Sequence, residues 1–462
     1  MVRVFGHHVR RMTVFLCALE AAIFTAVFFA VAKGLPLANL DPVTFGTFME
    51  VAVAPASLLF LGMIALGTYN IDVLQTPGVV TQRLIAVAIL GGAVFLAVVA
   101  LGLSDLITMR QLLLAEAAAF PLILLGRIGV RHLTAMPVLR NRALVLGTGE
   151  SARRVWEALR GDNLGRLSGF MDLQTASNPH PQVPPARTVA RPDSLVAYAT
   201  ASNIDQIVVA LDDRRALMPV EELLECRMRG ITVYDASTFI ERETGKVDLD
   251  GMRASWLIFG EGFHIGRIGR FLKRTLDIVV SGSLLILFAP VLLLTALLIK
   301  IDSKGPVFYR QIRVGLNGAP YSILKFRSMV QDAEKDGKAI WARSGDARVT
   351  RVGMIIRKAR IDEIPQAINV LKGDMSFVGP RPERPVFVEQ LAGEIPYYAE
   401  RHRVKPGITG WAQINYPYGA SVEDAREKLK YDLYYIKNQS LIFDLVIILQ
   451  TVRIVLFAEG AR

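Results

Sequence analysis

The chain has 462 residues, enough for more than one domain, and 52% of them are hydrophobic. A mean hydropathy of +0.37 exceeds that of an ordinary soluble globular protein, so we expect a membrane protein. The 53 lysines and arginines against 42 acidic residues give a net charge of +11, which suits anionic lipid headgroups, phosphorylated substrates or nucleic acid. We predict that the binding partners are a lipid bilayer and phosphorylated substrates, and that nucleic acid is not a partner. Cys17 and Cys226 form no disulfide framework or metal pattern, which permits a reducing location.

Four apolar stretches predict a four-helix transmembrane domain over residues 1–133. Each stretch approaches the roughly 20 residues that a bilayer-spanning helix needs. Arginines precede the first stretch and follow the fourth, so the positive-inside rule places both ends in the cytoplasm. The run behind the basic N-terminus lacks a small-residue cleavage signature, which indicates an anchor rather than a cleaved signal. The stretches are residues 13–32, 48–67, 84–103 and 112–125.

Three acidic residues lie singly within this domain. Glu20, Glu50 and Glu116 fall on separate spans with no cationic partner beside them in the sequence. We therefore expect an anchor without chemistry of its own. Its surfaces would allow a homodimer, although no heptad or other directed signal specifies one.

Residues 134–262 alternate short apolar strands with helical segments, which predicts a Rossmann-like α/β domain with a parallel sheet. In "VLGTGESA", Gly147 and Gly149 form a turn that can bring backbone amides close to a pyrophosphate, and Asp172 follows the second strand, where a ribose-binding acid could lie. One glycine fingerprint is a weak signal. We favour a structural or regulatory role over nucleotide binding.

The next apolar run is broken. Before it, "GRIGRFLKRTLD" interleaves basic residues with Ile268, Phe271 and Leu272, as in a helix that lies on a membrane surface. Residues 276–300 are long enough to span a membrane but contain Pro290, and cations stand on both sides. We expect a re-entrant helix that turns at Pro290 and leaves on the side where it entered. The alternative, a kinked full span, would place the following domain outside the cytoplasm.

The C-terminal part is polar and rich in arginine, and it ends in an apolar helix that charged residues interrupt, which favours a location at the membrane interface. Guanidinium groups match phosphate oxygens in geometry, so the cations predict a phosphate-bearing ligand. A solvated basic face against the membrane is the alternative for several of them. The candidate cations are Arg310, Arg313, Lys325, Arg327, Arg348, Arg357, Arg360, Arg381, Arg403 and Lys405.

Asp362 and Glu363 are adjacent within this cationic region, in "RKARIDEIPQ". Paired carboxylates can serve as general acid and base. In a phosphate-binding site, however, a better fit is one acid that attacks phosphorus beside a second that helps to hold Mg²⁺. Pro365 predicts the first turn of a helix, whose N-terminus would favour negative charge. A helix cap without chemistry is the alternative for an isolated pair.

The succession "KFRSM", "RKARIDEIPQ", "LKGDMSFVGPRPE" and "RVKPGITGWAQI" resembles the bacterial sugar transferase family, the monotopic phosphoglycosyl transferases. The resemblance covers residues 270–462, and the preceding spans and α/β domain make the chain similar to the long form, the undecaprenyl-phosphate glucose phosphotransferases. It implies a C-terminal α/β catalytic domain over residues 263–462, with a re-entrant helix and interfacial helices. The family commonly has Ser-Pro at the helix break, whereas this chain has Ala289-Pro290.

The resemblance also implies a mechanism in which Asp362 attacks the sugar-bearing phosphate of a UDP-sugar, expels UMP and forms a covalent phospho-sugar enzyme. Undecaprenyl phosphate then takes the phospho-sugar, which starts exopolysaccharide or capsule assembly at the cytoplasmic face of the bacterial inner membrane. Glu363 would be associated with Mg²⁺, Arg357 and Arg381 would contact phosphate, and glucose is the expected sugar. The further candidates for substrate binding are Lys325, Arg327, Arg348 and Gln366.

Two other functions remain open at this point. One is a membrane-anchored nucleotide-sugar oxidoreductase or epimerase centred on Gly147, which the lack of a Tyr-x-x-x-Lys pair in that domain disfavours. The other is a non-catalytic scaffold for polysaccharide assembly.

Overall fold

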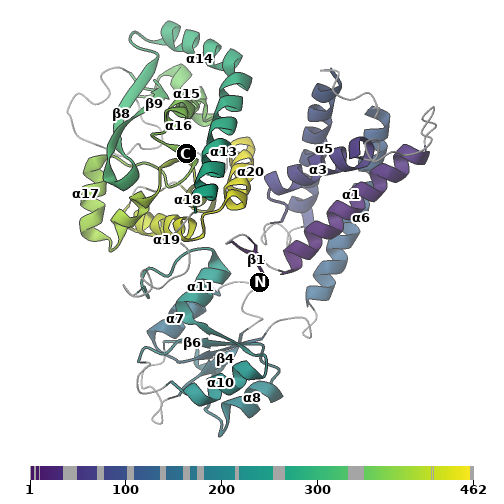
Figure 1. The fold of residues 1–462 in the computed structure, drawn as a ribbon, viewed down its shortest axis with the longest axis vertical. Helices are drawn as coiled ribbons and strands as arrows, with labels where there is room; N and C mark the ends of the chain where they lie inside the picture. The colour runs from purple at the N-terminus through teal and green to yellow at the C-terminus, as the bar shows by residue number, and fades with distance from the viewer. Residues whose placement is uncertain are drawn as a thin grey trace. The chain divides into compact units, whose positions relative to one another are not determined.

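The structure is a computed structural model, shown in Figure 1. The chain divides into two compact units, Met1–Ile128 with Gly262–Arg462, and Gly129–Glu261. The boundaries of the second unit are close to those predicted for the α/β domain, residues 134–262. The division of the chain into three domains stays a prediction. The described residues are 2–4, 7–9, 11–34, 49–69, 77–100, 109–135, 142–159, 167–173, 182–213, 218–252, 266–330, 348–417, 419 and 421–457.

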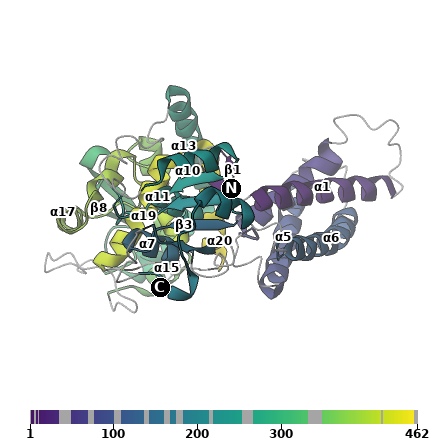
Figure 2. The same ribbon diagram turned by 90° about the horizontal axis from the view of Figure 1, so that it is seen from below.

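All four N-terminal apolar stretches contain helix. Three helices, α1 (Arg11–Gly34), α5 (Pro77–Ala100) and α6 (Met109–Ala135), are long and apolar enough to cross a membrane (Figure 2). The predicted second span instead combines a π-helical turn (Met49–Val53) with α3 (Ala54–Ala65), which has only 12 residues. Because a helix of that length is short for a bilayer, the bundle of four spans stays a prediction.

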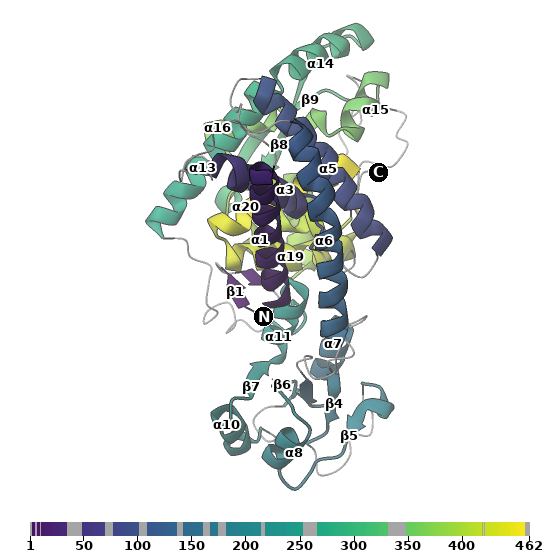
Figure 3. The same ribbon diagram turned by 90° about the vertical axis from the view of Figure 1, so that its right-hand side faces the viewer.

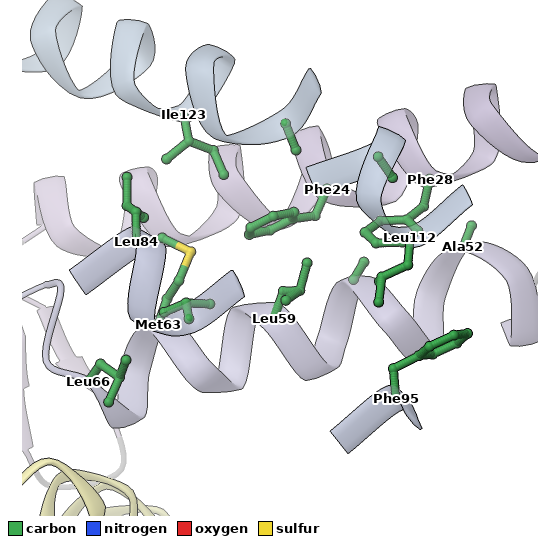
Figure 4. Close-up of a cluster of buried hydrophobic side chains, with 14 of the residues drawn as sticks. Phe24, Phe28, Ala52, Leu59, Met63, Leu66, Leu84, Phe95, Leu112 and Ile123 are labelled. Carbon is green, nitrogen blue, oxygen red and sulfur yellow. The ribbon is translucent and has the colours of Figure 1, made fainter. Parts of the chain in front are cut away.

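These helices share one apolar core. Phe24 of α1, Leu59 and Met63 of α3, Leu84 of α5 and Leu112 of α6 are all buried in it (Figure 4). Side chains from four helices therefore interlock, whether or not each helix crosses the bilayer.

The expectation that Glu20 lacks a cationic partner is wrong. Arg127 Nε donates to Glu20 Oε1 at 2.6 Å and Arg127 Nη2 donates to Oε2 at 3.0 Å, while Tyr69 Oη donates to Oε2 at 2.6 Å. The sequence pattern ended the fourth apolar stretch at residue 125, but α6 continues to Ala135, so Arg127 lies on the helix and reaches α1. Glu116 is buried, with no hydrogen-bond partner for Oε1 among the described residues, and the side chain of Glu50 lies outside them.

The Gly129–Glu261 unit, whose elements β4–β7 are labelled in Figure 3, is built on a five-stranded parallel sheet in the order β5-β4-β3-β6-β7. This is the order of a Rossmann-like half-fold, as expected. β3 and β6 are buried along their whole length because helices cover both faces, which explains why every residue in them except Gln206 is apolar. The elements are β3 (Ala143–Leu146), α7 (Glu150–Ala158), β4 (Leu167–Met171), β5 (Thr188–Val189), α8 (Leu195–Ala201), β6 (Gln206–Val209), α10 (Val220–Met228), β7 (Thr232–Asp235) and α11 (Ala236–Thr244).

The C-terminal part mixes helices with short strands, as predicted. β8 and β9 form an antiparallel hairpin, and β10 pairs with β11 in parallel. Its elements are α13 (Arg267–Leu287), α14 (Ala289–Asp302), β8 (Phe308–Val314), β9 (Pro320–Phe326), α15 (Arg351–Lys358), η6 (Ile361–Glu363), α16 (Gln366–Lys372), β10 (Ser376–Val378), α17 (Pro385–Glu394), β11 (Gly407–Thr409), α18 (Trp411–Asn415), α19 (Val422–Asn438) and α20 (Leu441–Phe457).

The predicted break at Pro290 is a bend of 62° between α13 and α14 (Figure 3). Pro290 lies in the first turn of α14, where its missing N–H costs no helical hydrogen bond. Large apolar side chains on both sides of the bend are exposed, among them Ile286 and Leu293, and such a surface needs lipid or protein cover. A re-entrant pair and a broken span share this geometry, so re-entry stays a prediction.

The first half of α13 is fixed to the strand that leads into "GPRP". The buried Asp277 carboxylate accepts hydrogen bonds from Ser376 Oγ and from the Phe377 backbone N–H, both at 2.9 Å. Arg274 donates to the Val370 carbonyl at 2.6 Å. Polar residues of α13 therefore hold β10 in position.

A second polar cluster joins α13 to α20. Lys273 Nζ lies 2.8 Å from Asp444 Oδ2, and Tyr435 Oη donates to Asp444 Oδ1 at 2.8 Å. Asp444 is fully buried, so the charged residue that interrupts the C-terminal apolar helix is paired inside the protein.

Candidate active site

A sharp backbone turn presents the two adjacent acids. After α15, Arg360 adopts a left-handed conformation with φ of +58°, and the 3-10 turn Ile361–Glu363 follows at once. A residue with a Cβ rarely takes this conformation, and such strain is concentrated at functional sites. Pro365 then precedes α16, so Asp362 and Glu363 lie just before a helix N-terminus, close to where the sequence predicted them.

Glu363 is the anionic centre of the cluster. Its Oε1 accepts from Lys325 Nζ at 3.0 Å and from Arg381 Nη2 at 2.7 Å, and Arg381 Nη1 lies 3.4 Å from Oε2. Burial opposes the charge of this carboxylate, but Arg381 and Lys325 hold its pKa well below the ordinary value. Glu363 is therefore ionised at neutral pH, and β9 and the "GPRP" segment meet at its side chain.

Asp362 is held differently from its neighbour. It is buried, and no described residue donates a hydrogen bond to its side chain. Burial, followed by the charge of Glu363, raises the pKa of Asp362, while Lys325, Arg357 and Arg381 oppose that shift. A carboxylate that is weakly solvated, unbonded and surrounded by cations suits nucleophilic attack on a phosphate. Two adjacent acids thus have environments that separate their roles.

Close backbone packing places Arg381. Gly379 N donates to the Thr409 carbonyl and Gly407 N donates to the Pro380 carbonyl, both at 2.9 Å. A Cβ on Gly407 would lie only 2.1 Å from Gly379 N, so the glycine of "KPGITG" is required by this approach. Arg401 Nη2 donates to the Arg381 carbonyl at 3.0 Å. The "GPRP" and "KPGITG" motifs therefore form one support.

The buried charge of Arg401 has its own partner. Arg401 lies 2.8 Å from Asp432 of α19, and both side chains are almost fully buried. Neither residue was singled out from the sequence, because 31 residues separate them and no motif spacing links them.

The sequence analysis also missed Asn369, which joins α16 to β9. Its side chain accepts a hydrogen bond from Leu324 N at 2.9 Å and donates one to the Ser322 carbonyl at 2.8 Å.

The predicted site residues are brought together only in part. Lys325, Arg357 and Arg381 surround the two acids. Arg327 instead donates to the Ser303 and Lys304 carbonyls at 2.8 and 2.6 Å, and so holds the C-terminal end of α14. Arg348 is the first described residue after residue 330. Gln366 is the first residue of α16 and is buried.

The donor set is compatible with Mg²⁺ that shares its ligands with a substrate. Asp362 and Glu363 supply carboxylate oxygens, and among the described residues Glu363 Oε2 has only the longer contact with Arg381. The described residues contain no group of three or more His, Cys, Asp or Glu that could hold a metal ion by themselves. Mg²⁺ is commonly held by one or two carboxylates together with substrate phosphates and water, and these two acids fit that arrangement.

The glycine turn of the α/β unit is filled by the chain itself. Asp212, after β6, accepts from the backbone N–H groups of Glu150 and Ser151, both at 2.9 Å. A Cβ on Gly149 would lie 2.0 Å from Asp212 Oδ2. The first amides of α7, which would hold a pyrophosphate in a dinucleotide-binding protein, here bind an internal carboxylate. This observation favours the structural alternative for the fingerprint.

Fold and site together define a class: a membrane-associated protein whose polar part carries paired acids inside a cluster of half-buried cations. Residues 268–458 match the bacterial sugar transferase family. The chain is 48% identical over 192 residues to a UDP-glucose:undecaprenyl-phosphate glucose-1-phosphate transferase of Caulobacter vibrioides, a match that covers 41% of this chain and 71% of that protein. The chain belongs to the bacterial sugar transferase family, as the sequence motifs predicted.

Two longer relatives extend the similarity. The chain is 45% identical over 263 residues to a UDP-N-acetylgalactosamine-undecaprenyl-phosphate N-acetylgalactosaminephosphotransferase of Aeromonas hydrophila, covering 57% of this chain and 61% of that protein. It is 38% identical over 263 residues to a UDP-glucose:undecaprenyl-phosphate glucose-1-phosphate transferase of Escherichia coli, covering 56% of each. The matches thus span about three fifths of these two relatives.

Proposed function

We propose that this protein transfers a hexose-1-phosphate from a UDP-sugar to undecaprenyl phosphate through a covalent intermediate on Asp362. The observation that carries the proposal is the separation of roles between Asp362 and Glu363. Glu363 Oε1 is paired with Lys325 and Arg381, whereas Asp362 has cations nearby but no hydrogen bond from a described residue. The names of the relatives supply the substrate class.

In the first step, an Asp362 carboxylate oxygen attacks the sugar-bearing phosphorus. The bond from that phosphorus to the bridging oxygen breaks, and its electron pair leaves with UMP. Lys325, Arg357 and Arg381 stabilise the charge on the transferring group and the leaving phosphate. Bound Mg²⁺, with Glu363 as its protein ligand, would neutralise further charge on the phosphates.

In the second step, a phosphate oxygen of undecaprenyl phosphate attacks the same phosphorus and releases Asp362. The acceptor is a lipid, which accounts for an active domain next to exposed apolar helices. We propose that α13 and α14 re-enter the membrane and keep the site at the cytoplasmic face of the inner membrane, where exopolysaccharide or capsule assembly would start. Glucose is the proposed sugar, and N-acetylgalactosamine is the competing one.

A transfer assay tests the proposal. Purified protein in nanodiscs with undecaprenyl phosphate and radiolabelled UDP-glucose should give labelled lipid and one UMP per transferred sugar. UDP-galactose and UDP-N-acetylgalactosamine in parallel reactions identify the preferred sugar. Labelled lipid from none of the three donors would contradict the proposed activity.

A further inference from the structure

One polar group beside the active site lacks a hydrogen-bond partner within the described part of the chain. The Tyr321 phenol oxygen is buried and has no hydrogen-bond partner among the residues that the structure describes. Burying a hydroxyl without a partner is unfavourable, and native structures contain few such groups. This one therefore needs an explanation.

Tyr321 belongs to the face of the hairpin that carries Lys325. In the β8–β9 ladder, Tyr321 is paired with Arg313, and Lys325 is paired with Tyr309. Directly opposed residues of an antiparallel pair share a face, and so do residues two apart along a strand. Tyr321, Arg313 and Lys325 consequently lie on one surface of the hairpin, and Lys325 is bonded to Glu363.

The Tyr321 ring is fixed in place. A Cβ on Gly315 would lie 3.0 Å from Tyr321 Cδ1, so the ring packs directly against the backbone there. The partly buried Tyr321 side chain also packs against an apolar cluster that includes Ile323 and Met375. The position of the hydroxyl is therefore set by the fold.

Two guanidinium groups lie near this hydroxyl. Arg313 and Arg381 both act electrostatically on Tyr321, and Asp374 is the acidic group that does so. Arg313 Nη1 donates to the Pro382 carbonyl at 3.1 Å, directly after Arg381 in the chain. Burial raises the pKa of the Tyr321 phenol, so it remains an O–H donor at physiological pH. An O–H donor beside two guanidinium groups suits an anionic oxygen.

The cations near Asp362 and those near Tyr321 form two overlapping groups. Lys325, Arg357 and Arg381 are the cations with the largest effect on the Asp362 carboxylate, whereas Arg313 acts on Lys325 and on Tyr321. Arg381 is common to both neighbourhoods. A nucleoside diphosphate sugar has two phosphates joined by one oxygen, so a sugar-bearing phosphate at Asp362 places the second phosphate next to it.

We propose that Tyr321 binds the second, nucleotide-side phosphate of the donor, with its hydroxyl donating to a phosphate oxygen and the charge of Arg313 adding electrostatic attraction. The inference rests on the proposed function and adds the site for its leaving group. When the bond to the bridging oxygen breaks, negative charge grows on this phosphate, and a hydrogen bond that strengthens there accelerates the step. No proton is transferred, because the nucleotide leaves as an anion.

Tyr321→Phe tests the assignment because it removes one oxygen and keeps the ring. Inhibition of adduct formation by UMP and by uridine is compared in the intact protein in nanodiscs. A hydrogen bond to a charged group is worth roughly a tenfold change in affinity or more. We expect UMP inhibition to weaken by about tenfold with uridine inhibition unchanged, because uridine lacks the phosphate. Tyr198→Phe, in the α/β unit, is the matched control and should change neither value.

The two half-reactions give an independent readout. Adduct formation at low UDP-glucose should slow in Tyr321→Phe by about the same factor, whereas transfer from preformed adduct to undecaprenyl phosphate should keep its wild-type rate. Unchanged UMP inhibition, or equal slowing of both half-reactions, would overturn the assignment while leaving the proposed function intact. Failure of the wild-type protein to form any adduct would instead contradict the proposed function.

Discussion

Arg381 Nη2 lies 2.7 Å from Glu363 Oε1, the same oxygen that Lys325 Nζ approaches at 3.0 Å. This shared contact joins the "GPRP" segment and the β8–β9 hairpin to the acid that follows Asp362. Asp362, one residue earlier, is the carboxylate that receives no direct hydrogen bond from the residues that the structure describes. The predictions below follow from that difference.

Replacing Glu363 by Gln should weaken both the fold and the reaction. The substitution leaves Lys325 and Arg381 without the anion that they share, and breaking a buried ion pair costs on the order of 3 kcal/mol. We expect a lower thermal unfolding midpoint and adduct formation slower by roughly 100-fold. Differential scanning fluorimetry and rapid-quench mass spectrometry would measure the two effects. A variant with wild-type stability and rate would contradict the role of Glu363.

Replacing Asp362 by Asn should abolish the reaction but stabilise the fold. A carboxyl group whose folded pKa is raised resists ionisation, so the native state loses stability as pH rises from about 4 to about 6. The amide removes this cost, which we expect to be on the order of 3 kcal/mol above pH 6, because the pKa is raised from 3.8 to about 6. The unfolding midpoints of the two proteins should therefore differ at pH 8 and converge near pH 4. A variant less stable than wild type at pH 8 would contradict this environment for Asp362.

The first half-reaction should depend on the ionisation of Asp362. Burial raises the pKa of this carboxyl group to about 6, and only the ionised form attacks phosphorus. The single-turnover rate of adduct formation should be constant above pH 7 and should fall about tenfold per pH unit well below 6. Rapid-quench mass spectrometry between pH 5 and 8 measures this dependence of the rate on pH. A rate that is unchanged down to pH 5 would mean that the nucleophile has an ordinary carboxyl pKa.

Asp277 should influence the site from a distance through β10. Asp277→Ala leaves Ser376 Oγ and the Phe377 N–H without their acceptor, and an unsatisfied buried group costs about 1–3 kcal/mol. We expect a lower unfolding midpoint and a higher KM for the UDP-sugar, because Arg381 follows this strand by a few residues. Asp277→Asn keeps an acceptor oxygen and should restore most of both properties. Equal damage from the two variants would show that the negative charge, not the acceptor, is needed.

The N-terminal helices offer a matched pair of buried acids. Glu20→Gln weakens contacts with Arg127 and Tyr69, whereas Glu116→Gln neutralises a carboxylate with one oxygen that has no hydrogen-bond partner among the described residues. We expect the first variant to lower the unfolding midpoint and the second to leave it unchanged or raise it. The rate of adduct formation should be that of wild type in both. A larger loss in Glu116→Gln would contradict the pairing of Glu20 with Arg127.

The sequence predicted the parts of this protein whose information is local. The "RIDE" and "GPRP" motifs identified Asp362, Glu363 and Arg381, and Pro290 marked the boundary between α13 and α14. Side-chain partners that lie far apart in the chain were not predictable from spacing. Glu20 and Arg127 are separated by 107 residues, and Asp277 and Ser376 by 99.

The same limit explains the outcome for Arg327. Arg327 was predicted to bind substrate as one of many cations in the C-terminal part, but only the folded chain shows that its guanidinium group donates to the Ser303 and Lys304 carbonyls. Likewise, the glycines at 147 and 149 match a dinucleotide fingerprint, and only the structure reveals the carboxylate of Asp212 at that turn. A motif specifies residue types, whereas the fold decides which partner reaches them first.

The central claim is the covalent step at Asp362, and intact-mass spectrometry tests it most directly. Wild-type protein incubated with UDP-glucose in the absence of undecaprenyl phosphate should gain the mass of one phospho-hexose, located on the peptide that contains Asp362. The added mass should disappear when undecaprenyl phosphate is supplied and should never form in Asp362→Asn. An unmodified wild-type protein that nevertheless produces lipid-linked sugar phosphate, or an Asp362→Asn variant that still gains the added mass, would contradict the account.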